Sequence, residues 1–300
     1  MIVTDRNIGV MNLKYIVTIC IALVLSACRA NYTIDVEPDF MMFSSEEYTL
    51  GVVDNEEWFE IPVSATKVVD YDRRIGVEVL WSESSAIEGL HYVVESNTLT
   101  IPAGKLTTAL RIRGIAENIA VGEELTLCLN LVLEEENVSK LYSTRSEVKL
   151  QRCCKFDINN FVGYAKITST WTMQYMNSDA RLVVTERGTK ENSIVIKNMF
   201  YDGYDIEVEF DDSNLLEPRV IMPDAQVVGI TGEAFGTIYG DGKLLMSEPT
   251  GYTSYFGACE NFMVLYSMMY VENVGTVGVY VNIFEWITKD EYDRLMREGF

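Results

Sequence analysis

The sequence predicts an all-β protein in which a β-sandwich is followed by an antiparallel β-barrel-like domain with a short C-terminal helix. Apolar and polar residues alternate over most of the chain, which is the period of strands that bury one face. Turn sequences that contain glycine separate these runs, as at 186–189 and 240–243. The helical signal is a capping box from Thr288 to Glu291 near the end of the chain.

Residues 1–27 have the pattern of a lipoprotein signal peptide. Lys14 precedes a mostly apolar run, 16–27, that is too short to span a bilayer. The run ends in Leu-Ser-Ala-Cys, which resembles the bacterial lipobox. That resemblance implies that Cys28 is acylated, with palmitate among the expected acyl groups, and becomes the mature N-terminus. Met11 is an alternative start to Met1, because the segment from Met11 already has the usual signal length.

A lipid anchor at Cys28 would make residues 28–45 a tether and place the folded chain in the cell envelope. The acyl chains would supply the membrane attachment. The expected location is the outer membrane, on its periplasmic face or at the cell surface. The net charge of −21 repels phosphate backbones and therefore excludes nucleic acid as an expected partner. The remaining partners are the membrane, through the anchor, and a glycan or another envelope protein.

Residues 46–152 are predicted to form the sandwich. About seven strand candidates in roughly 100 residues suit two packed sheets. Two alternating rows define its clearest strands, since in each the apolar residues share one face. The rows are Ile75, Val77, Val79 and Trp81, and then Leu125, Leu127, Leu129, Leu131 and Leu133.

Residues 153–300 are predicted to form the barrel and the terminal helix. Strands follow one another in meander order with short turns, which suits a closed or nearly closed barrel without free edges. The clearest alternating rows are Ile206, Val208 and Phe210, and then Val277, Val279, Val281 and Ile283. Thr288 is the predicted N-cap of the helix, whose apolar stripe we expect to pack on the barrel.

Four cysteines follow the anchor, at positions 128, 153, 154 and 259. An exported protein permits disulfides, and four cysteines allow three full pairings. Cys153 and Cys154 are adjacent and point to opposite faces of a strand, so they do not easily share a partner. Free buried thiols are the alternative. Zinc is not expected, because the chain has a single histidine and no Cys-x-x-Cys.

Residues 77–133 resemble a Calx-β domain. The resemblance implies an immunoglobulin-like sandwich. Members of that family in ion exchangers bind calcium through clustered carboxylates, one of which precedes the motif tyrosine. Here that position is His91, a poor ligand for a hard cation, so calcium is implied by the resemblance alone and no metal ligand or other cofactor is predicted. The segments that carry the resemblance are 86–92, 97–104, 110–112 and 123–127.

The start of the second half, Asn160-Phe161-Val162-Gly163-Tyr164, is similar to the entry of lipocalin-like barrels. Taken together, the lipobox, the Calx-β-like sandwich and the lipocalin-like domain resemble two-domain Bacteroidetes lipoproteins of unknown function. That resemblance implies no activity.

No catalytic residues are predicted. His91 is the single histidine, the Calx-β resemblance places it at a structural turn, and no Gly-x-Ser-x-Gly motif accompanies it. The chain has no phosphate loop and no dinucleotide fingerprint. A hydrolase that uses a pair of carboxylates is an alternative, because Asp and Glu are plentiful and their spacing in the fold is not visible in the sequence.

Two aromatic loops of the second half are the candidate binding residues. One carries Tyr201 and Tyr204, and the other carries Tyr252 and Tyr255, each beside Asp, Asn, Ser or Thr. Aromatic faces stack on sugar rings while neighbouring polar groups bond their hydroxyls, so carbohydrate is the leading ligand. Two alternatives remain: these tyrosines cover the barrel ends, or the protein is a structural or adhesion spacer that contacts another envelope protein.

Overall fold

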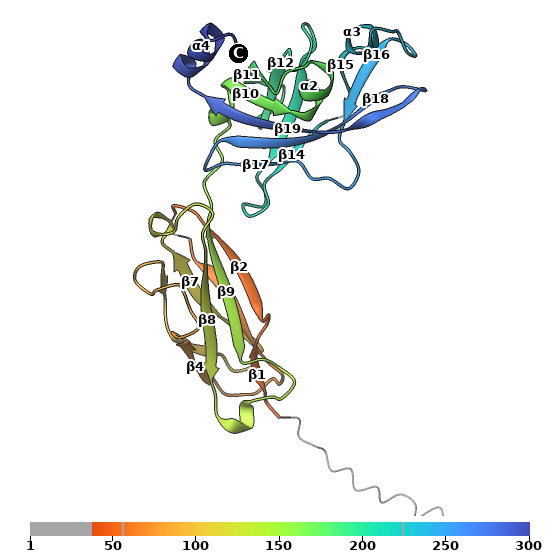
Figure 1. The fold of residues 1–300 in the computed structure, drawn as a ribbon. Helices are drawn as coiled ribbons and strands as arrows, with labels where there is room; N and C mark the ends of the chain where they lie inside the picture. Colours follow the sequence, from red (N-terminus) through yellow and green to blue (C-terminus); the bar gives the residue numbers. More distant parts are fainter. Residues whose placement is uncertain (1–37, 56, 224) are drawn as a thin grey trace, which may run out of the picture.

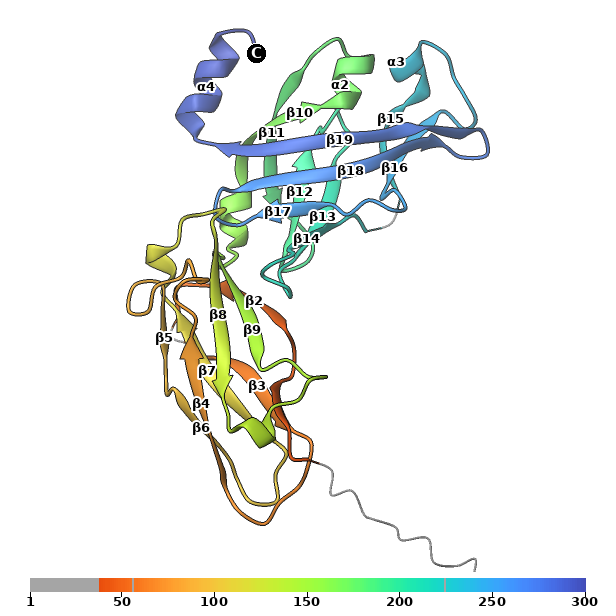
Figure 2. The same cartoon turned by 60° about the horizontal axis from the view of Figure 1, so that its bottom comes forward.

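The computed structural model describes residues 38–300 except 56 and 224, and it shows two β domains in succession (Figures 1 and 2). The sandwich lies at one end and the barrel at the other, with the C-terminal helix beside the barrel. The predicted fold class is therefore confirmed. The signal peptide and Cys28 lie outside the described residues. Within the described part, no helix is long and apolar enough to cross a membrane.

The sandwich consists of a four-stranded sheet in the order β1-β3-β7-β5 and a five-stranded sheet in the order β2-β9-β8-β4-β6. β2 and β9 run parallel, and the other neighbours are antiparallel. The strands are β1 (Met41–Phe43), β2 (Glu47–Val52), β3 (Phe59–Ala65), β4 (Arg73–Val79), β5 (Tyr92–Val94), β6 (Thr98–Ile101), β7 (Thr107–Gly114), β8 (Glu124–Val132) and β9 (Arg145–Arg152).

The leucine row predicted for 125–131 is the central stripe of the sandwich core. All four of these leucines lie on β8 and are buried, and the fifth, Leu133, follows the strand and packs on the core partly buried. The polar residues between them face outward, as period-2 alternation requires. Two 3-10 turns, η1 (Ala116–Asn118) and η2 (Glu135–Asn137), flank β8.

The sandwich begins earlier than the sequence indicated. Residues 41–43, which we placed in the tether, form β1 and pair with β3, with Met41 opposite Ala65. Met41 and Phe43 are both buried, so the strand contributes to the core. Just before it, Asp39 accepts two hydrogen bonds from the buried Arg73 guanidinium at 2.9 and 3.1 Å. An Arg buried without this partner would be costly. The Asp39–Arg73 ion pair therefore holds the chain against the sandwich before β1 begins.

β4 is shorter than the predicted row. It ends at Val79, so Trp81 lies in a turn and is 60% exposed rather than in the core. Ile75 and Val77 are buried as predicted, and Val79 packs against the core partly buried.

The second domain is an eight-stranded closed antiparallel barrel, in the order β10-β11-β12-β13-β14-β17-β18-β19, closed by the pairing of β18 with β19. A hairpin of β15 and β16 is inserted after β14 and extends the sheet from β18. The strands are β10 (Gly163–Ser169), β11 (Ala180–Arg187), β12 (Ser193–Lys197), β13 (Ile206–Asp211), β14 (Arg219–Ile221), β15 (Gln226–Ile230), β16 (Lys243–Ser247), β17 (Tyr255–Gly257), β18 (Phe262–Val271) and β19 (Gly275–Ile287).

Short helices occupy the connections of the barrel. α2 (Thr170–Tyr175) follows β10, α3 (Thr231–Phe235) follows β15, and the 3-10 turn η3 (Ile158–Phe161) leads into β10. The predicted terminal helix is α4 (Lys289–Arg297), and Thr288 accepts a hydrogen bond from the Glu291 amide at 3.2 Å, as the capping box requires. It packs on β10 through the rings of Tyr164 and Tyr292, whose centroids are 4.6 Å apart.

β19 turns most of its predicted valine row away from the core, although Val277 packs against it. Tyr280, Asn282 and Phe284 face the interior and are buried, whereas Val279 and Ile283 are about two-fifths exposed, at 42% and 40%. Both faces of this strand are apolar, so alternation alone does not decide which one is inside. The outer wall of the barrel therefore carries apolar residues.

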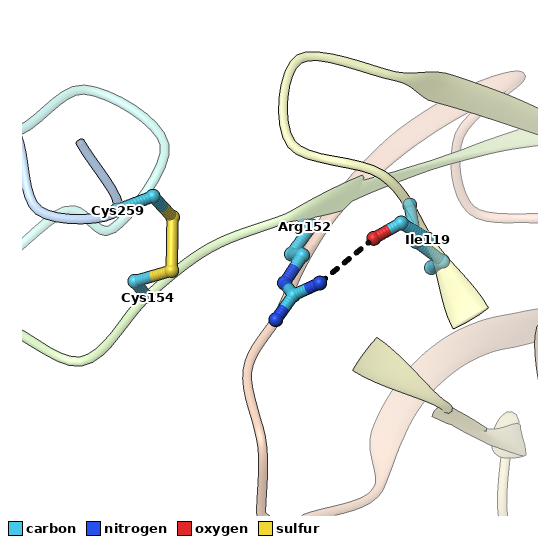
Figure 3. Close-up of a disulfide and its surroundings, with 4 residues drawn as sticks. All are labelled: Ile119, Arg152, Cys154 and Cys259. Carbon is cyan, nitrogen blue, oxygen red and sulfur yellow. Dashed lines mark hydrogen bonds between the residues drawn. A yellow bond between two sulfur atoms is a disulfide. The ribbon is translucent and has the colours of Figure 1, made fainter. Parts of the chain in front are cut away.

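The segment between the two domains is fastened to the barrel by a disulfide (Figure 3). Cys154, which follows β9, is bonded to Cys259 in the β17–β18 loop, 105 residues away. Cys128 and Cys153 are free. The four cysteines thus form one disulfide and leave two free thiols, so only one pair of a full pairing is present. Burial raises the pKa of the Cys153 thiol.

We expect the barrel to depend on this disulfide for stability. Replacing both partners, Cys154→Ser with Cys259→Ser, should lower the free energy of unfolding by about 2–4 kcal/mol, because the cross-link restricts a long loop of the unfolded chain. Denaturant titration followed by tryptophan fluorescence measures this. Cys128→Ser, which removes a free thiol of the sandwich, is the control and should leave the barrel transition in place. Equal midpoints for all three proteins would contradict the expectation.

Candidate functional site

The interior of the barrel is occupied by side chains. At the end near the sandwich, five aromatic rings pack together with centroid separations from 4.7 to 5.6 Å: Phe156, Phe161, Phe210, Phe256 and Trp286. At the other end, Trp171 lies 5.0 Å from Tyr280 and 4.3 Å from Tyr175. Eight strands leave an interior just wide enough for such filling. Recognition of a ligand by the barrel must therefore use its outer surface or its ends.

A buried polar layer lies between the two aromatic groups. Asn282 accepts from the Ser169 hydroxyl at 2.7 Å and donates to Leu265 O and to Ser267 Oγ, both at 2.9 Å. Each of the three polar side chains is at most 1% exposed. Because this layer is hydrogen-bonded internally, it fixes the register of the barrel core rather than forming an open site.

Tyr201 is a core residue and not a surface aromatic. It is 5% exposed, and burial raises the pKa of its hydroxyl. The β15 strand covers it: a Cβ on Gly229 would lie 2.5 Å from its ring, so glycine there is needed for close approach. Tyr204, in the same loop, is half-buried and also packs against the core. We therefore correct the expectation that these two tyrosines offer a binding face.

Tyr252 and Tyr255 are exposed on the outer wall of the barrel, at 50% and 42%. The Tyr252 ring lies against that of Tyr266 on β18, with centroids 5.2 Å apart and planes inclined by 37°. Tyr255 pairs with Val264, so Tyr266 is its diagonal neighbour on the same face. Tyr252 and Tyr266 are thus in ring contact, and Tyr255, whose ring lies 6.1 Å from that of Phe262, shares their outer face.

This surface continues across the sheet into β19. Val264 lies opposite Ile283, which is 40% exposed, and Tyr266 lies opposite Val281. We call Tyr252, Tyr255, Tyr266 and Ile283 the outer-wall patch; Val264, which lies among them, is only 7% exposed and forms its floor. Contiguous exposed apolar residues of this kind mark binding surfaces more often than isolated ones do.

The outer-wall patch is held in place by a buried serine. Ser254 lies between the two exposed tyrosines in sequence and is 1% exposed. Its hydroxyl accepts from the Tyr266 amide at 3.0 Å, and its carbonyl accepts from the Val220 amide at 2.9 Å. The loop is therefore tied to β18 and β14, so the tyrosines are positioned before any ligand arrives.

A cavity of about 250 Å³ lies between the two domains. Its walls come from residues 121–123 of the sandwich, the connecting segment, the β13–β14 loop and the disulfide. Arg152, which lines it, donates from Nη1 to Ile119 O at 3.3 Å (Figure 3). Glu123, Asp212 and Glu260 line the same cavity, so its net charge does not favour an anionic ligand.

The histidine of the sandwich is engaged in a local turn, and the described part of the sandwich contains no metal cluster. His91 Nδ1 accepts from the Ile87 amide at 3.1 Å, which engages it in a local turn. Across the described residues, no three His, Cys, Asp or Glu side chains are grouped closely enough to hold a metal ion. Glu134, Glu135 and Glu136 are exposed at η2. The sequence reasoning missed one feature of this domain, a cleft beside Trp81, whose only sequence signal is the large aromatic at the end of a strand row.

Residues 141–298 match a family model described as a domain of unknown function, DUF4984. The chain belongs to this family. The match covers all of the barrel and the outer-wall patch, together with β9 of the sandwich. No protein among the curated proteins matches.

Several solved structures are similar to this chain in fold. The apo form of the Calx CBD1 domain is 22% identical and covers 39% of this chain and 98% of its own, with a TM-score of 0.32. A Bacteroides ovatus protein of unknown function is 11% identical over 82% of this chain and 91% of its own, with a TM-score of 0.35. Another Bacteroides ovatus protein, named as a candidate carbohydrate binding protein, is 14% identical over 81% of this chain and 67% of its own, with a TM-score of 0.31. TM-scores this low carry no argument about function.

The assignment of Tyr201 to the core and of Tyr252 to the surface of the DUF4984 barrel can be tested by measuring the stability of variants. Tyr201→Ala should cost about 3–5 kcal/mol of unfolding free energy, because it leaves a cavity in the core. Tyr252→Ala should change stability by no more than about 0.5 kcal/mol, as surface substitutions usually do. Denaturant unfolding of the two variants measures this difference. Similar losses in both would show that the core and surface positions are misassigned.

Proposed function

We propose that this protein is a lipid-anchored envelope protein that binds carbohydrate, without catalysis, through the outer-wall patch. The observation that carries the proposal is the exposure of Tyr252 and Tyr255, beside Tyr266, on one outer face of a barrel whose interior is already filled. The aliphatic faces of sugar rings stack on tyrosine rings, and the phenol hydroxyls bond sugar hydroxyls at their edges.

The shape of the patch favours an extended glycan over a small free sugar. The tyrosines lie on a sheet wall rather than inside a pocket, so one sugar ring would bury little of its surface there. A chain of several residues can cover Tyr252, Tyr266 and the row from Tyr255 to Ile283 together. Arg219 of β14, the exposed cross-strand partner of Tyr255, supplies donors at the rim.

The arrangement of the two domains supports display away from a membrane. The described chain begins at the end of the sandwich that is farther from the barrel (Figures 1 and 2). An anchor at Cys28 would therefore place the sandwich next to the membrane and the outer-wall patch beyond it. The Cys154–Cys259 disulfide also fits an exported protein, because disulfides persist in oxidising compartments.

A spacer or adhesion role is the second candidate function, and it is favoured by the same end-to-end arrangement. In that case the sandwich would set the distance and another envelope protein would take the place of the glycan. A hydrolase would need two carboxylates about 5–10 Å apart in a cleft. The outer-wall patch is built instead from tyrosine and aliphatic side chains.

Glycan binding is tested by an array screen of the exported chain. We expect binding to extended glycans, and a loss of at least about tenfold in the double variant Tyr252→Ala with Tyr255→Ala, since stacking on aromatic rings dominates such contacts. Tyr71→Ala, which removes a tyrosine of the sandwich that is at least as exposed, is the control and should bind normally. An array without any bound glycan, or equal losses in both variants, would contradict the proposal.

Lipid anchoring is tested by mass spectrometry of the mature N-terminus. We expect Cys28 as the first residue, carrying acyl chains, and recovery of the protein in the membrane fraction. Cys28→Ala should move the protein out of that fraction, because the acyl chains supply its membrane affinity. An intact and unacylated N-terminus in the soluble fraction would overturn this part of the proposal whatever the array shows.

A further inference from the structure

The cleft beside Trp81 is a second place where the protein could hold a ligand. It measures about 570 Å³ and opens on the side of the sandwich between β4 and the segment that connects β5 to β6. Val77, Val79 and Val94 form part of its apolar floor. It lies outside the region matched by the family model and belongs to a different domain from the outer-wall patch.

Trp81 is held in its exposed position by the backbone. The Leu80 amide donates to Cys128 O at 2.9 Å, and the Glu83 amide donates back to Leu80 O at 3.0 Å. Ser84 Oγ then accepts from the Cys128 amide at 2.9 Å and donates to Leu80 O at 3.0 Å. These bonds fix the turn, so the 60% exposure of the indole is built into the fold. A large aromatic held in water beside a cleft is typical of a binding position.

The charge of the cleft selects the kind of ligand. Glu78, Glu88 and Glu95 line it, and the lining contains no Lys, Arg or His. Glu95 is paired with Arg111 at 2.8 Å, and Glu78 accepts from Asn130 at 2.8 Å. Within the described residues, the exposed Glu88 carboxylate has neither an ion pair nor a side-chain hydrogen bond. The cleft therefore presents a negative rim with one uncommitted carboxylate.

Trp58, the other tryptophan at the surface of the sandwich, shows that cationic side chains pack on an indole of this domain. Trp58 carries two guanidinium groups, those of Arg111 and Arg113, with their central carbons 5.6 and 5.3 Å from its ring centroid. Trp81 has acidic neighbours in its cleft, but among the described residues no Lys, Arg or His lines that cleft. An indole face and carboxylates together stabilise an organic cation.

We propose that the Trp81 cleft binds a lysine or arginine side chain of a partner protein. The cation would lie over the Trp81 ring and pair with Glu88, while its aliphatic stem would cover the valine floor, as long basic side chains do on apolar surface. The valine floor favours such a stem over the hydroxyl-covered body of an amino sugar. The net charge of −21 adds a general attraction for a basic partner.

Small probes on the full chain test the site directly. N-acetyl-lysine amide and N-acetyl-arginine amide are titrated while the indole N–H signal of Trp81 is followed by NMR, with N-acetyl-norleucine amide as the uncharged analogue. We expect saturable shifts with the two basic probes only. Trp81→Ala and Glu88→Gln should each weaken the affinity about two- to fivefold, the range for exposed cation–π contacts and single charges. The Trp81→Ala variant lacks the indole N–H reporter, and its binding is therefore measured by calorimetry.

The controls separate this site from its alternatives. Glu135→Gln removes an exposed acid elsewhere on the sandwich and should leave the affinity unchanged. If Glu135→Gln weakened the affinity as much as Glu88→Gln, the binding would be explained by the overall charge of the protein. If the norleucine probe bound as well as the basic probes, the binding would be explained by apolar contact alone. Glucosamine binding in preference to both basic probes would assign the cleft to amino sugars. Each of these results, and the absence of any shift, overturns the proposal. Glycan binding at the outer-wall patch is unaffected by all of them.

Discussion

Closure of the barrel is the constraint on which the rest of the second domain depends. β19 pairs with β10 on one side and with β18 on the other, so the first and last strands of the domain complete the same ring. Once eight strands close, their interior holds little more than the side chains that line it. The aromatic rings at the two ends and the polar layer around Asn282 fill that volume. Any recognition by this domain is then a property of its outside.

β19 shows how closure decides which residues are available. Its alternate positions are apolar on both faces, and the ring has room for only one of them. Tyr280, Asn282 and Phe284 are enclosed because they complete the core with Trp171 and Ser169. Val279 and Ile283 are left outside, on the face that carries Tyr255 and Tyr266. The outer-wall patch is thus a consequence of packing in the interior, which selects what the surface displays.

Much of the architecture could be predicted from the sequence, because it follows from local patterns. The leucines of β8 alternate and are buried, and Thr288 caps α4 as its spacing with Glu291 indicates. The individual sites depend on tertiary contacts that a local pattern does not contain. Tyr201 is covered by a hairpin that begins 25 residues later, and only the close approach at Gly229 shows this. Trp81 continues a strand row by period, but the turn bonded to Cys128 moves it out of the core.

The parallel pairing of β2 with β9 has a mechanical consequence. Six residue pairs join these strands, from Glu47 opposite Glu147 to Val52 opposite Arg152. A tether acting before β2 and a load acting on the barrel after β9 would pull the two strands in opposite directions along their length. Their hydrogen bonds would then be sheared together rather than opened one at a time. The sandwich would therefore resist extension applied between its N-terminal strands and the barrel.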